Sequence, residues 1–285
     1  MNPSEASVIS LPDGGTMPRL GLGTWHLGES AGTGRDEVRA VQHAIASGIE
    51  MIDTAEMYGD GGAEEVVGEA LRQAKAERER LFIVSKVYPW NASKRGTIAA
   101  CEASLKRLGI ATLDLYLLHW RGEHPLAETV EGFEKLKRDG KIRRWGVSNF
   151  DTGDMRELAT VSAPGACVAN QVYYNLAKRW PEATLLPWQR KSGVICMAYS
   201  PLDQGSLARH RVVKAVAARW GVTPVQAAVA WLLSHPGVVA IPKSSRIDGI
   251  NEIAASAELA LTQDDCDELE RAFPTPPKSA RMQTT

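Results

Sequence analysis

Residues 81–119 are LFIVSKVYPWNASKRGTIAACEASLKRLGIATLDLYLLH, and they contain a complete strand–helix–strand unit. An apolar run precedes Lys86, a helix-length amphipathic stretch covers residues 94–108, and a second apolar run ends at His119. Gly109 directly follows the helical stretch, at the position where a left-handed residue ends a helix. This order predicts two parallel strands joined by a crossover helix.

The same alternation extends over the rest of the chain. A turn signal at residues 12–15 predicts a hairpin near the N-terminus. Eight candidate strands follow at residues 20–24, 51–53, 82–86, 113–119, 144–148, 168–171, 194–199 and 238–241. Candidate helices are found at residues 35–47, 63–73, 94–108, 125–139, 152–160, 212–220, 224–234, 248–259 and 263–272. The pattern predicts an α/β protein, a (β/α)8 TIM barrel with an N-terminal β-hairpin and extra helices in its last third.

The composition favours a single domain that spans residues 1–285. No Ser-rich, Pro-rich or single-charge segment is long enough to act as a flexible linker. The alternative architecture, a doubly wound sheet, needs a glycine-rich nucleotide loop. Gly21 and Gly23 begin such a motif, but His26 stands where the third glycine belongs, so the dinucleotide fingerprint fails. The barrel is therefore the preferred fold.

The charges of the chain are balanced, with 33 Lys and Arg residues against 34 Asp and Glu residues and a formal net charge of −1. Such a balance gives no general attraction to nucleic acid or to an anionic membrane. No stretch of the sequence is long and apolar enough to cross a bilayer, and the start, MNPSEASVIS, lacks a basic segment. These features predict a cytoplasmic protein.

The cysteines, Cys101, Cys167, Cys196 and Cys266, are far apart and form no C-x-x-C motif. We expect buried free thiols, as is usual for a protein of a reducing compartment. A disulfide between Cys167 and Cys196, on neighbouring predicted strands, is the alternative.

Four polar residues stand at or soon after the ends of predicted strands: Asp53, Tyr58, Lys86 and His119. Asp53, Lys86 and His119 follow one another at intervals of 33 positions, about the length of one strand-plus-helix unit. The carboxyl ends of the strands in a parallel barrel open onto one face, where such folds build their active sites. An acid, a phenol, an amine and an imidazole at that face predict proton chemistry.

Lys86 closes an apolar run, so its side chain is expected to be partly buried and to need a partner, for which Asp53 is the obvious candidate. A structural ion pair is the simpler interpretation, but it leaves Tyr58 and His119 unexplained at the same face. A cation about 4 Å from a phenol contributes roughly 4 kcal/mol at an effective dielectric of ~20, which lowers a pKa near ~10 by an amount of order three units. We therefore expect Lys86 to bring Tyr58 to proton exchange near neutral pH. His119 is expected to orient or polarise a substrate oxygen.

His119 has an alternative role as a metal ligand, because it forms a His-x4-His pair with His124 beside Glu123. The segment between the two histidines is predicted to be a loop, which loses the helical register that would align the imidazoles. The first strand also lacks the His-x-His pair of a metal-dependent barrel hydrolase. We expect no metal site.

Several of these segments together resemble the aldo-keto reductase family. In chain order they are GLGTW (21–25), DTAEMYG (53–59), SK (85–86), LYLLHW (115–120), GVSNF (146–150) and IPKS (241–244). The match extends from about residue 17 to residue 261, nearly the whole chain, and the order of the motifs makes it highly specific.

The resemblance implies a barrel enzyme that uses NADPH to reduce aldehydes and ketones by direct hydride transfer. It makes Tyr58 the general acid, which Lys86 and Asp53 tune, and it makes His119 the residue that orients the carbonyl group. Having His rather than Glu at position 119 favours reduction of carbonyl groups over reduction of carbon–carbon double bonds.

The resemblance also implies a binding site for NADPH or NADP+. Its residues match positions for the nicotinamide carboxamide (Ser148, Asn149, Gln171), the nicotinamide ring (Tyr199) and the ribose (Thr24, Asp53), with Gly23, Ser200 and Leu202 beside them and Lys243, Ser244, Ser245 and Arg246 at a phosphate. Without the resemblance, Ser148 and Asn149 would be interpreted as a loop cap and Tyr199 as a core aromatic.

The segment 243–246 offers two cations and two hydroxyls to a phosphate, which favours NADPH over NADH. Two later positions depart from the family, which usually has Arg and Asn where this chain has Gly249 and Ile253. Three nearby residues are candidates to compensate: Arg246, Asn251 and Glu252.

Three tryptophans, Trp25, Trp90 and Trp120, follow strand ends and match or lie near aromatic positions of the family's substrate pocket, to which Tyr58 and His119 also belong. The tail, residues 274–285, is short and polar, which predicts an open and permissive pocket. The segment KVYPWN (86–91) resembles bacterial members that act on small aldehydes, including methylglyoxal. We therefore expect turnover of aldehydes from C3 compounds to aromatic ones.

Two other classes of function stay open. The first is an NADPH-binding sensor or scaffold with little turnover, a role that a barrel of this family can serve. The second is a metal-dependent barrel hydrolase. The expected partner is a small-molecule carbonyl compound, without nucleic acid or membrane, and the protein is expected to be a monomer.

Overall fold

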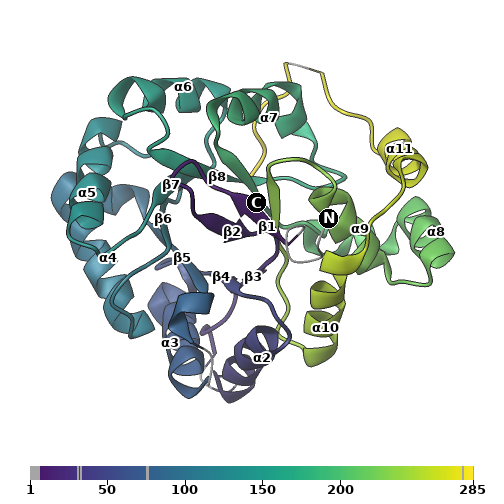
Figure 1. Ribbon diagram of the computed structural model, residues 1–285, viewed down its shortest axis with the longest axis horizontal. Helices are drawn as coiled ribbons and strands as arrows, with labels where there is room; N and C mark the ends of the chain where they lie inside the picture. The colour runs from purple at the N-terminus through teal and green to yellow at the C-terminus, as the bar shows by residue number, and fades with distance from the viewer. Residues whose placement is uncertain (1–6, 31, 33, 75–76, 278, 285) are drawn as a thin grey trace.

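The computed structural model describes residues 7–30, 32, 34–74, 77–277 and 279–284. Eight parallel strands form one sheet in the order β10-β9-β8-β7-β6-β5-β4-β3. They are β3 (Gly21–Gly23), β4 (Met51–Asp53), β5 (Phe82–Val87), β6 (Leu115–Leu118), β7 (Trp145–Ser148), β8 (Cys167–Tyr173), β9 (Ile195–Tyr199) and β10 (Val238–Ile241). Leu20 forms a parallel bridge with Ala240, whose amide donates to Arg19 O at 2.9 Å, so the two edges meet and the sheet closes into a barrel (Figure 1).

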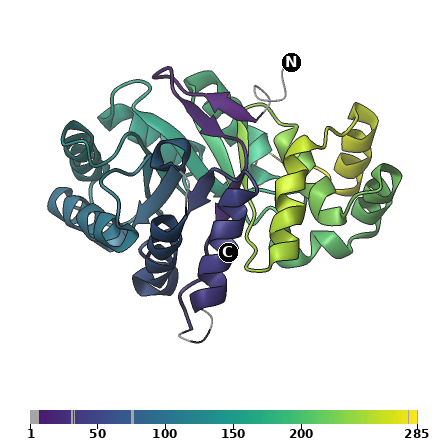
Figure 2. The same cartoon turned by 60° about the horizontal axis from the view of Figure 1, so that its bottom comes forward.

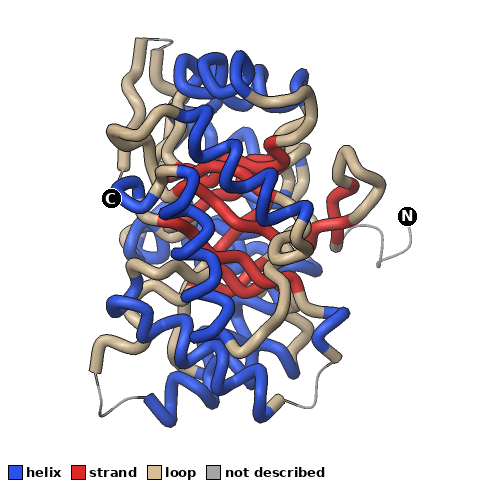
Figure 3. Tube along the Cα trace, turned by 90° about the vertical axis from the view of Figure 1, so that its left-hand side faces the viewer, coloured by secondary structure: helices blue, strands red, loops and turns tan. Residues whose placement is uncertain are grey.

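A hairpin of β1 (Val8–Ser10) and β2 (Thr16–Pro18) precedes the barrel. Its buried side chains Leu11 and Met17 belong to a cluster inside the barrel, together with the first residues of β4, β5, β6 and β9. The hairpin therefore covers the end of the barrel where the strands begin, and it projects from that side in Figure 3. The other end of the barrel is left for a site.

Helices surround the barrel on the outside, as Figures 1 and 2 show. In the described part of the chain they are α2 (Gly34–Ala46), α3 (Gly62–Gln73), α4 (Lys94–Leu108), α5 (Leu126–Arg138), α6 (Thr152–Val161), α7 (Trp180–Ser192), α8 (Arg211–Trp220), α9 (Pro224–Leu233), α10 (Ile247–Ala255) and α11 (Gln263–Ala272). Their apolar faces and the outward side chains of the strands form the larger of two hydrophobic clusters.

Strand β5 shows how the alternation of side chains divides the barrel interior from the outer layer. Ile83 belongs to the cluster under the helices, whereas Phe82 and Val84 belong to the cluster inside the barrel. Because successive side chains of a strand point to opposite faces, Lys86 points into the barrel and Ser85 points toward the helices. The sequence register of this strand thus decides which polar group reaches the interior.

The predicted barrel, hairpin and extra helices are confirmed. Helix α7 is not among the predicted helices, because Pro181 and Pro187 weaken its pattern and a proline removes a backbone donor. Burial of Leu185 and Leu186 against the core favours the helix all the same. The helix predicted over residues 248–259 ends as α10 at Ala255 and continues as a short 3₁₀ turn.

The four cysteines are free and buried, so the alternative disulfide between Cys167 and Cys196 is not formed. The described helices are all too short or too polar to span a bilayer.

Candidate active site

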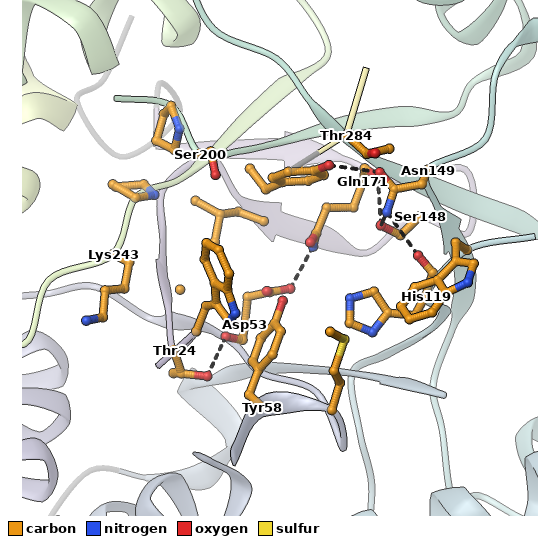
Figure 4. A pocket seen from close by; sticks show the side chains of 18 of the residues that line it. Thr24, Asp53, Tyr58, His119, Ser148, Asn149, Gln171, Ser200, Lys243 and Thr284 are labelled. Carbon is orange, nitrogen blue, oxygen red and sulfur yellow. Dashed lines mark hydrogen bonds between the residues drawn. The ribbon is translucent and has the colours of Figure 1, made fainter. Parts of the chain in front are cut away.

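A cavity of about 890 Å³ opens at the end of the barrel where the strands end. Its walls include the last residues of five strands, Gly23, Asp53, Ser148, Tyr199 and Ile241. Figure 4 shows Lys243 toward one side of the cavity and His119 toward the other, with Asp53 and Tyr58 between them. The predicted site residues that line the cavity are Gly23, Thr24, Trp25, Asp53, Tyr58, His119, Trp120, Ser148, Asn149, Gln171, Tyr199, Ser200, Leu202 and Lys243.

Lys86 does not line the cavity: it is fully buried behind Asp53 and Tyr58, which do. Its Nζ atom donates to Asp53 Oδ1 at 2.6 Å, to Thr54 O at 3.0 Å and to Tyr58 Oη at 3.1 Å. The three hydrogen bonds use the full donor capacity of an ammonium group. The predicted pairing of Lys86 with Asp53 is therefore present, and the phenol of Tyr58 shares the same ammonium.

The pKa of Tyr58 is raised above the usual value near 10, because burial disfavours the phenolate more strongly than Lys86 favours it, and Asp53 adds to the rise. The expectation that Lys86 brings Tyr58 to exchange near neutral pH is therefore wrong for this structure: it counted the cation and left out desolvation. Burial also opposes the charge on Lys86, but Asp53 and Tyr58 outweigh it, and the pKa of Lys86 is raised. At neutral pH the pair is a protonated phenol held by an ammonium.

His119 follows β6 and is buried. Burial, and to a lesser extent the charge of Lys86, hold the pKa of His119 well below its usual 6.5, so the imidazole is neutral at physiological pH. Its ring lies edge-on to the ring of Tyr58, with the centroids 5.8 Å apart. The Nδ1 atom has no hydrogen-bond partner among the described residues. A neutral imidazole beside a protonated phenol suits a polar, uncharged ligand.

The alternative metal site is not assembled by the described residues. His124 Nε2 lies 3.1 Å from Trp90 O, so this imidazole is engaged with a backbone carbonyl. No group of three or more His, Cys, Asp or Glu side chains in the described residues is arranged to hold a metal ion.

A second polar group lies beside the first, at the end of β7 and within β8. Gln171 Nε2 donates to Asp53 Oδ2 at 2.7 Å, and the hydroxyl of Ser148 donates to Gln171 O at 2.8 Å. Asn149 has a left-handed φ of 56°, and its amide donates to Ser148 Oγ at 3.2 Å while it accepts from the Tyr199 hydroxyl at 2.9 Å. Figure 4 shows this chain of hydrogen bonds along the cavity wall. Asp53 thus joins the Lys86 group to the amide group.

The ring of Tyr199 forms a flat part of the cavity wall. Tyr173 stacks on it with an interplanar angle of 4° and a centroid distance of 5.4 Å. Because Tyr173 does not line the cavity, its contact supports the ring from the side away from the cavity. A supported aromatic plane beside amide groups is suited to a flat heteroaromatic ligand.

Several predicted site residues lie outside the cavity lining. Trp90 is 63% exposed, stacks on Tyr88 and contacts Trp120, which does line the cavity, edge-on. Ser244, Ser245 and Arg246 are also outside the lining, although they directly follow Lys243.

The loop that begins α10 has its own hydrogen bonds. Ser244 Oγ bonds the amide and the carbonyl of Arg246, and a Cβ atom at Gly249 would lie 2.5 Å from Ser244 Oγ. Asn251 is held at 2.6 Å by His43 Nε2. Of the candidates to compensate for Gly249 and Ile253, Asn251 is therefore already engaged elsewhere.

Eleven residues of the lining are not among the predicted site residues: His26, Met57, Arg121, Asp154, Pro201, Gln204, Gly205, Ile241, Pro242, Met282 and Thr284. Five of these residues are directly adjacent in the chain to predicted site residues, and that adjacency is the signal that could have found them: His26, Met57, Arg121, Pro201 and Pro242. Met282 and Thr284 belong to the tail, where no motif marks them. The tail therefore forms part of the cavity wall.

The barrel and its buried tyrosine–lysine–aspartate group are those of an oxidoreductase that acts on carbonyl groups. The chain belongs to the aldo/keto reductase family, whose family model matches residues 19–273.

Two curated relatives from bacteria illustrate the similarity. Methylglyoxal reductase YeaE of Escherichia coli (strain K12) is 47% identical over 277 residues, which cover 95% of this chain and 96% of that protein. Glyoxal reductase of Bacillus subtilis (strain 168) is 36% identical over 282 residues, which cover 97% and 98%. A crystal structure of an aldo-keto reductase from Klebsiella pneumoniae in complex with NADPH has a TM-score of 0.92 and 45% identity, with 98% of this chain and 99% of that chain covered.

Proposed function

We propose that this protein is an NADPH-dependent reductase of aldehydes and ketones, and that small 2-oxoaldehydes such as methylglyoxal are among its substrates. One observation carries the proposal: a protonated phenol, Tyr58, lies 3.1 Å from the ammonium of Lys86 beside a neutral imidazole, His119, on the wall of a large cavity. The relatives named above are reductases of methylglyoxal and glyoxal, which supports the substrate class.

The residues of the cavity fit a nicotinamide cofactor. A flat aromatic ring, Tyr199, stands beside the amides of Asn149 and Gln171 and the hydroxyl of Ser148, which together offer the donors and acceptors that a carboxamide needs. Thr24, whose hydroxyl donates to Asp53 O at 3.0 Å, is proposed to lie at the ribose, with Asp53 itself. Gly23, Ser200 and Leu202 complete this side of the site.

The phosphates of the cofactor are proposed to lie toward Lys243, the residue on the far side of the cavity from His119 in Figure 4. Ser244, Ser245 and Arg246 continue from it and offer a further cation and hydroxyls to the 2′-phosphate of NADPH. Gly249 of α10 has no side chain that could contact this phosphate. The preference for NADPH over NADH is therefore proposed to depend on the loop residues 243–246 and not on the helix.

Bound NADPH supplies a hydride to the carbonyl carbon. The chain's own part is to hold the carbonyl oxygen and to provide the proton. His119, neutral at physiological pH, donates to or orients the carbonyl oxygen. Tyr58 gives its phenolic proton to that oxygen as negative charge develops there, and Lys86 stabilises the resulting phenolate. Asp53 keeps Lys86 charged and fixed.

The substrate is proposed to enter between Trp25 and Trp120, which line the cavity together with Met57 and the tail residue Met282. These apolar walls exclude water from the reacting carbonyl group and give space for aromatic aldehydes as well as C3 compounds. Trp90 contributes from outside, through its contact with Trp120. We further propose that the protein acts as a monomer in the cytoplasm.

The test is steady-state oxidation of NADPH by the purified protein with a panel of aldehydes that includes methylglyoxal and an aromatic aldehyde. We expect saturable turnover that a chelator leaves unchanged. Tight binding of NADPH without turnover would favour the sensor or scaffold function instead, and loss of activity with chelator would favour the hydrolase class.

A further inference from the structure

Glu64 is a fully buried carboxylate that takes no part in the proposed chemistry. It stands in the first turn of α3 and does not line the cavity. Its two oxygens accept from two different elements, Oε1 from the hydroxyl of Ser85 at 2.5 Å and Oε2 from Arg107 Nε at 2.6 Å. A buried carboxylate is costly unless it is paired and hydrogen-bonded, and here both conditions are met.

Glu64 is connected to the site in two ways, through its partner Ser85 and through its own helix, α3. Ser85 is the residue before Lys86 in β5, and its side chain faces the helices while that of Lys86 faces the barrel. Tyr58 begins the short 3₁₀ turn Tyr58–Gly61, which runs directly into α3. Glu64 therefore ties the segment that carries the phenol to the strand that carries the ammonium.

The junction around Glu64 leaves little room for the two elements to slide. Gly61 has a left-handed φ of 90°, and a Cβ atom there would lie 2.7 Å from Arg107 Cδ. A Cβ atom at Gly68, which is one turn after Glu64 in α3, would lie 2.5 Å from Arg107 O. Because α3 and the end of α4 are packed this closely, the carboxylate of Glu64 sets their position against β5.

We propose that Glu64 is a positioning residue that holds Tyr58 and Lys86 at hydrogen-bonding distance through its bonds to Ser85 and Arg107. The proposal rests on the function proposed above. Glu64 acts on the proton-transfer step only, because neither it nor Ser85 touches the cavity. A misplacement of a reacting group by about 1 Å can lower the rate by roughly 100-fold. A rigid connection between the two segments would therefore have a large effect on kcat.

The experiment compares four variants: Ser85→Ala, which cuts the bond to β5, Ser85→Thr, which keeps the hydroxyl, Glu64→Ala, which cuts both bonds, and Glu65→Ala, an exposed neighbour on the same helix. We expect Ser85→Ala to lower kcat by roughly tenfold and Glu64→Ala by roughly 100-fold. The KM for aldehyde and the affinity for NADPH, measured by quenching of tryptophan fluorescence, should stay within about twofold, as they depend on the cavity walls. Ser85→Thr and Glu65→Ala should behave as the parent.

A pH profile separates positioning from a general loss of structure. Lys86 lowers the pKa of Tyr58, so a longer distance between them should move the alkaline limb of kcat to higher pH in Ser85→Ala and not in Ser85→Thr. Unchanged kcat in folded Ser85→Ala and Glu64→Ala would overturn the proposal. Parallel loss of kcat, NADPH affinity and folded fraction would overturn it too, because it would show a purely structural role. If Glu64→Ala does not fold, the comparison of Ser85→Ala with Ser85→Thr is the test of the proposal.

Failure of the proposed function is seen separately, as a parent protein that turns over no carbonyl compound. In that event the phenol itself is titrated, by the difference in ultraviolet absorbance between each variant and its Tyr58→Phe counterpart. A shift of this titration to higher pH in Ser85→Ala relative to Ser85→Thr supports the positioning role, and identical curves overturn it.

Discussion

The Nζ atom of Lys86 lies 3.1 Å from the phenol oxygen of Tyr58, and the same ammonium lies 4.8 Å from the centroid of the tyrosine ring. The cation therefore acts on the hydroxyl and borders the face of the ring. Burial keeps the proton on Tyr58, and the charge of Lys86 stabilises the phenolate once the proton is transferred. A phenol that stays protonated at neutral pH, beside a cation that offsets part of the cost of forming its phenolate, suits the reduction of a carbonyl group.

Replacing Tyr58 by Phe removes the proton donor and keeps the ring. We expect kcat for carbonyl reduction to fall by roughly 100-fold or more, in the range of general acid catalysis. NADPH affinity, measured by fluorescence quenching, should change little, because the hydroxyl bonds Lys86 and not the amide wall. Substantial remaining turnover would mean that another group donates the proton.

Replacing Lys86 by Met leaves the buried carboxylate of Asp53 without its charged partner. Breaking a buried pair in this way should lower the free energy of unfolding by about 3–5 kcal/mol. Urea denaturation of the parent and the variant measures this difference. The double variant Lys86→Met with Asp53→Asn should regain much of the stability, since no unpaired charge remains. Both proteins should be inactive, which separates the stabilising role of the pair from its role in catalysis.

The pH dependence of activity should follow the raised pKa of Tyr58. Reduction needs the protonated phenol, so kcat should be flat across neutral pH and fall only above about pH 10, where the usual tyrosine pKa lies. His119, with its pKa well below 6.5, should add no titration between pH 6.5 and 8. A fall in kcat centred near pH 7 would contradict both assignments.

The pH dependence of stability should carry the signature of His119. Its pKa in the folded protein lies below the unfolded value of about 6.5, so between these two values the unfolded chain binds a proton that the folded protein does not. Stability should therefore fall as the pH drops below about 6.5. Urea titrations of the parent and of His119→Asn between pH 5 and 8 measure this, and equal slopes in the two proteins would rule His119 out as the cause.

The aromatic residues at the mouth offer a matched pair of substitutions. Trp120 lines the cavity, whereas Trp90 lies outside it, so Trp120→Ala should raise KM for an aromatic aldehyde by roughly tenfold, as expected for about 1.5 kcal/mol of lost apolar contact. Trp90→Ala should have a much smaller effect, and kcat/KM for methylglyoxal should change little in either protein. The opposite order would show that the outer tryptophan binds the substrate directly.

The tail contributes to the same wall through Met282. Met282→Ala should raise KM for aromatic aldehydes by roughly threefold, since a partly buried apolar contact is lost, and leave NADPH affinity unchanged. Arg281→Ala, a change at the exposed neighbouring residue, is the control. Equal KM values in all three proteins would show that the tail does not border bound substrate.

Much of the fold follows from patterns within short stretches of sequence. The strands of the barrel are apolar because both of their faces are buried, and their regular spacing by helices identifies the architecture. Helix α7 escapes prediction because its stability comes from Leu185 and Leu186 against the core, which outweighs the effect of its two prolines. Local propensity could not reveal that contact.

The residue types and their places at strand ends, Asp53, Lys86 and His119, are determined by the sequence alone, because the side-chain alternation of a strand and the length of a strand–helix unit are local properties. Tertiary structure decided the rest. Desolvation raised the pKa of Tyr58 against the pull of Lys86, and packing returned Met282 and Thr284 to the cavity while it left Trp90 outside. Burial and packing depend on segments far apart in the chain, so they exist only once the barrel has closed.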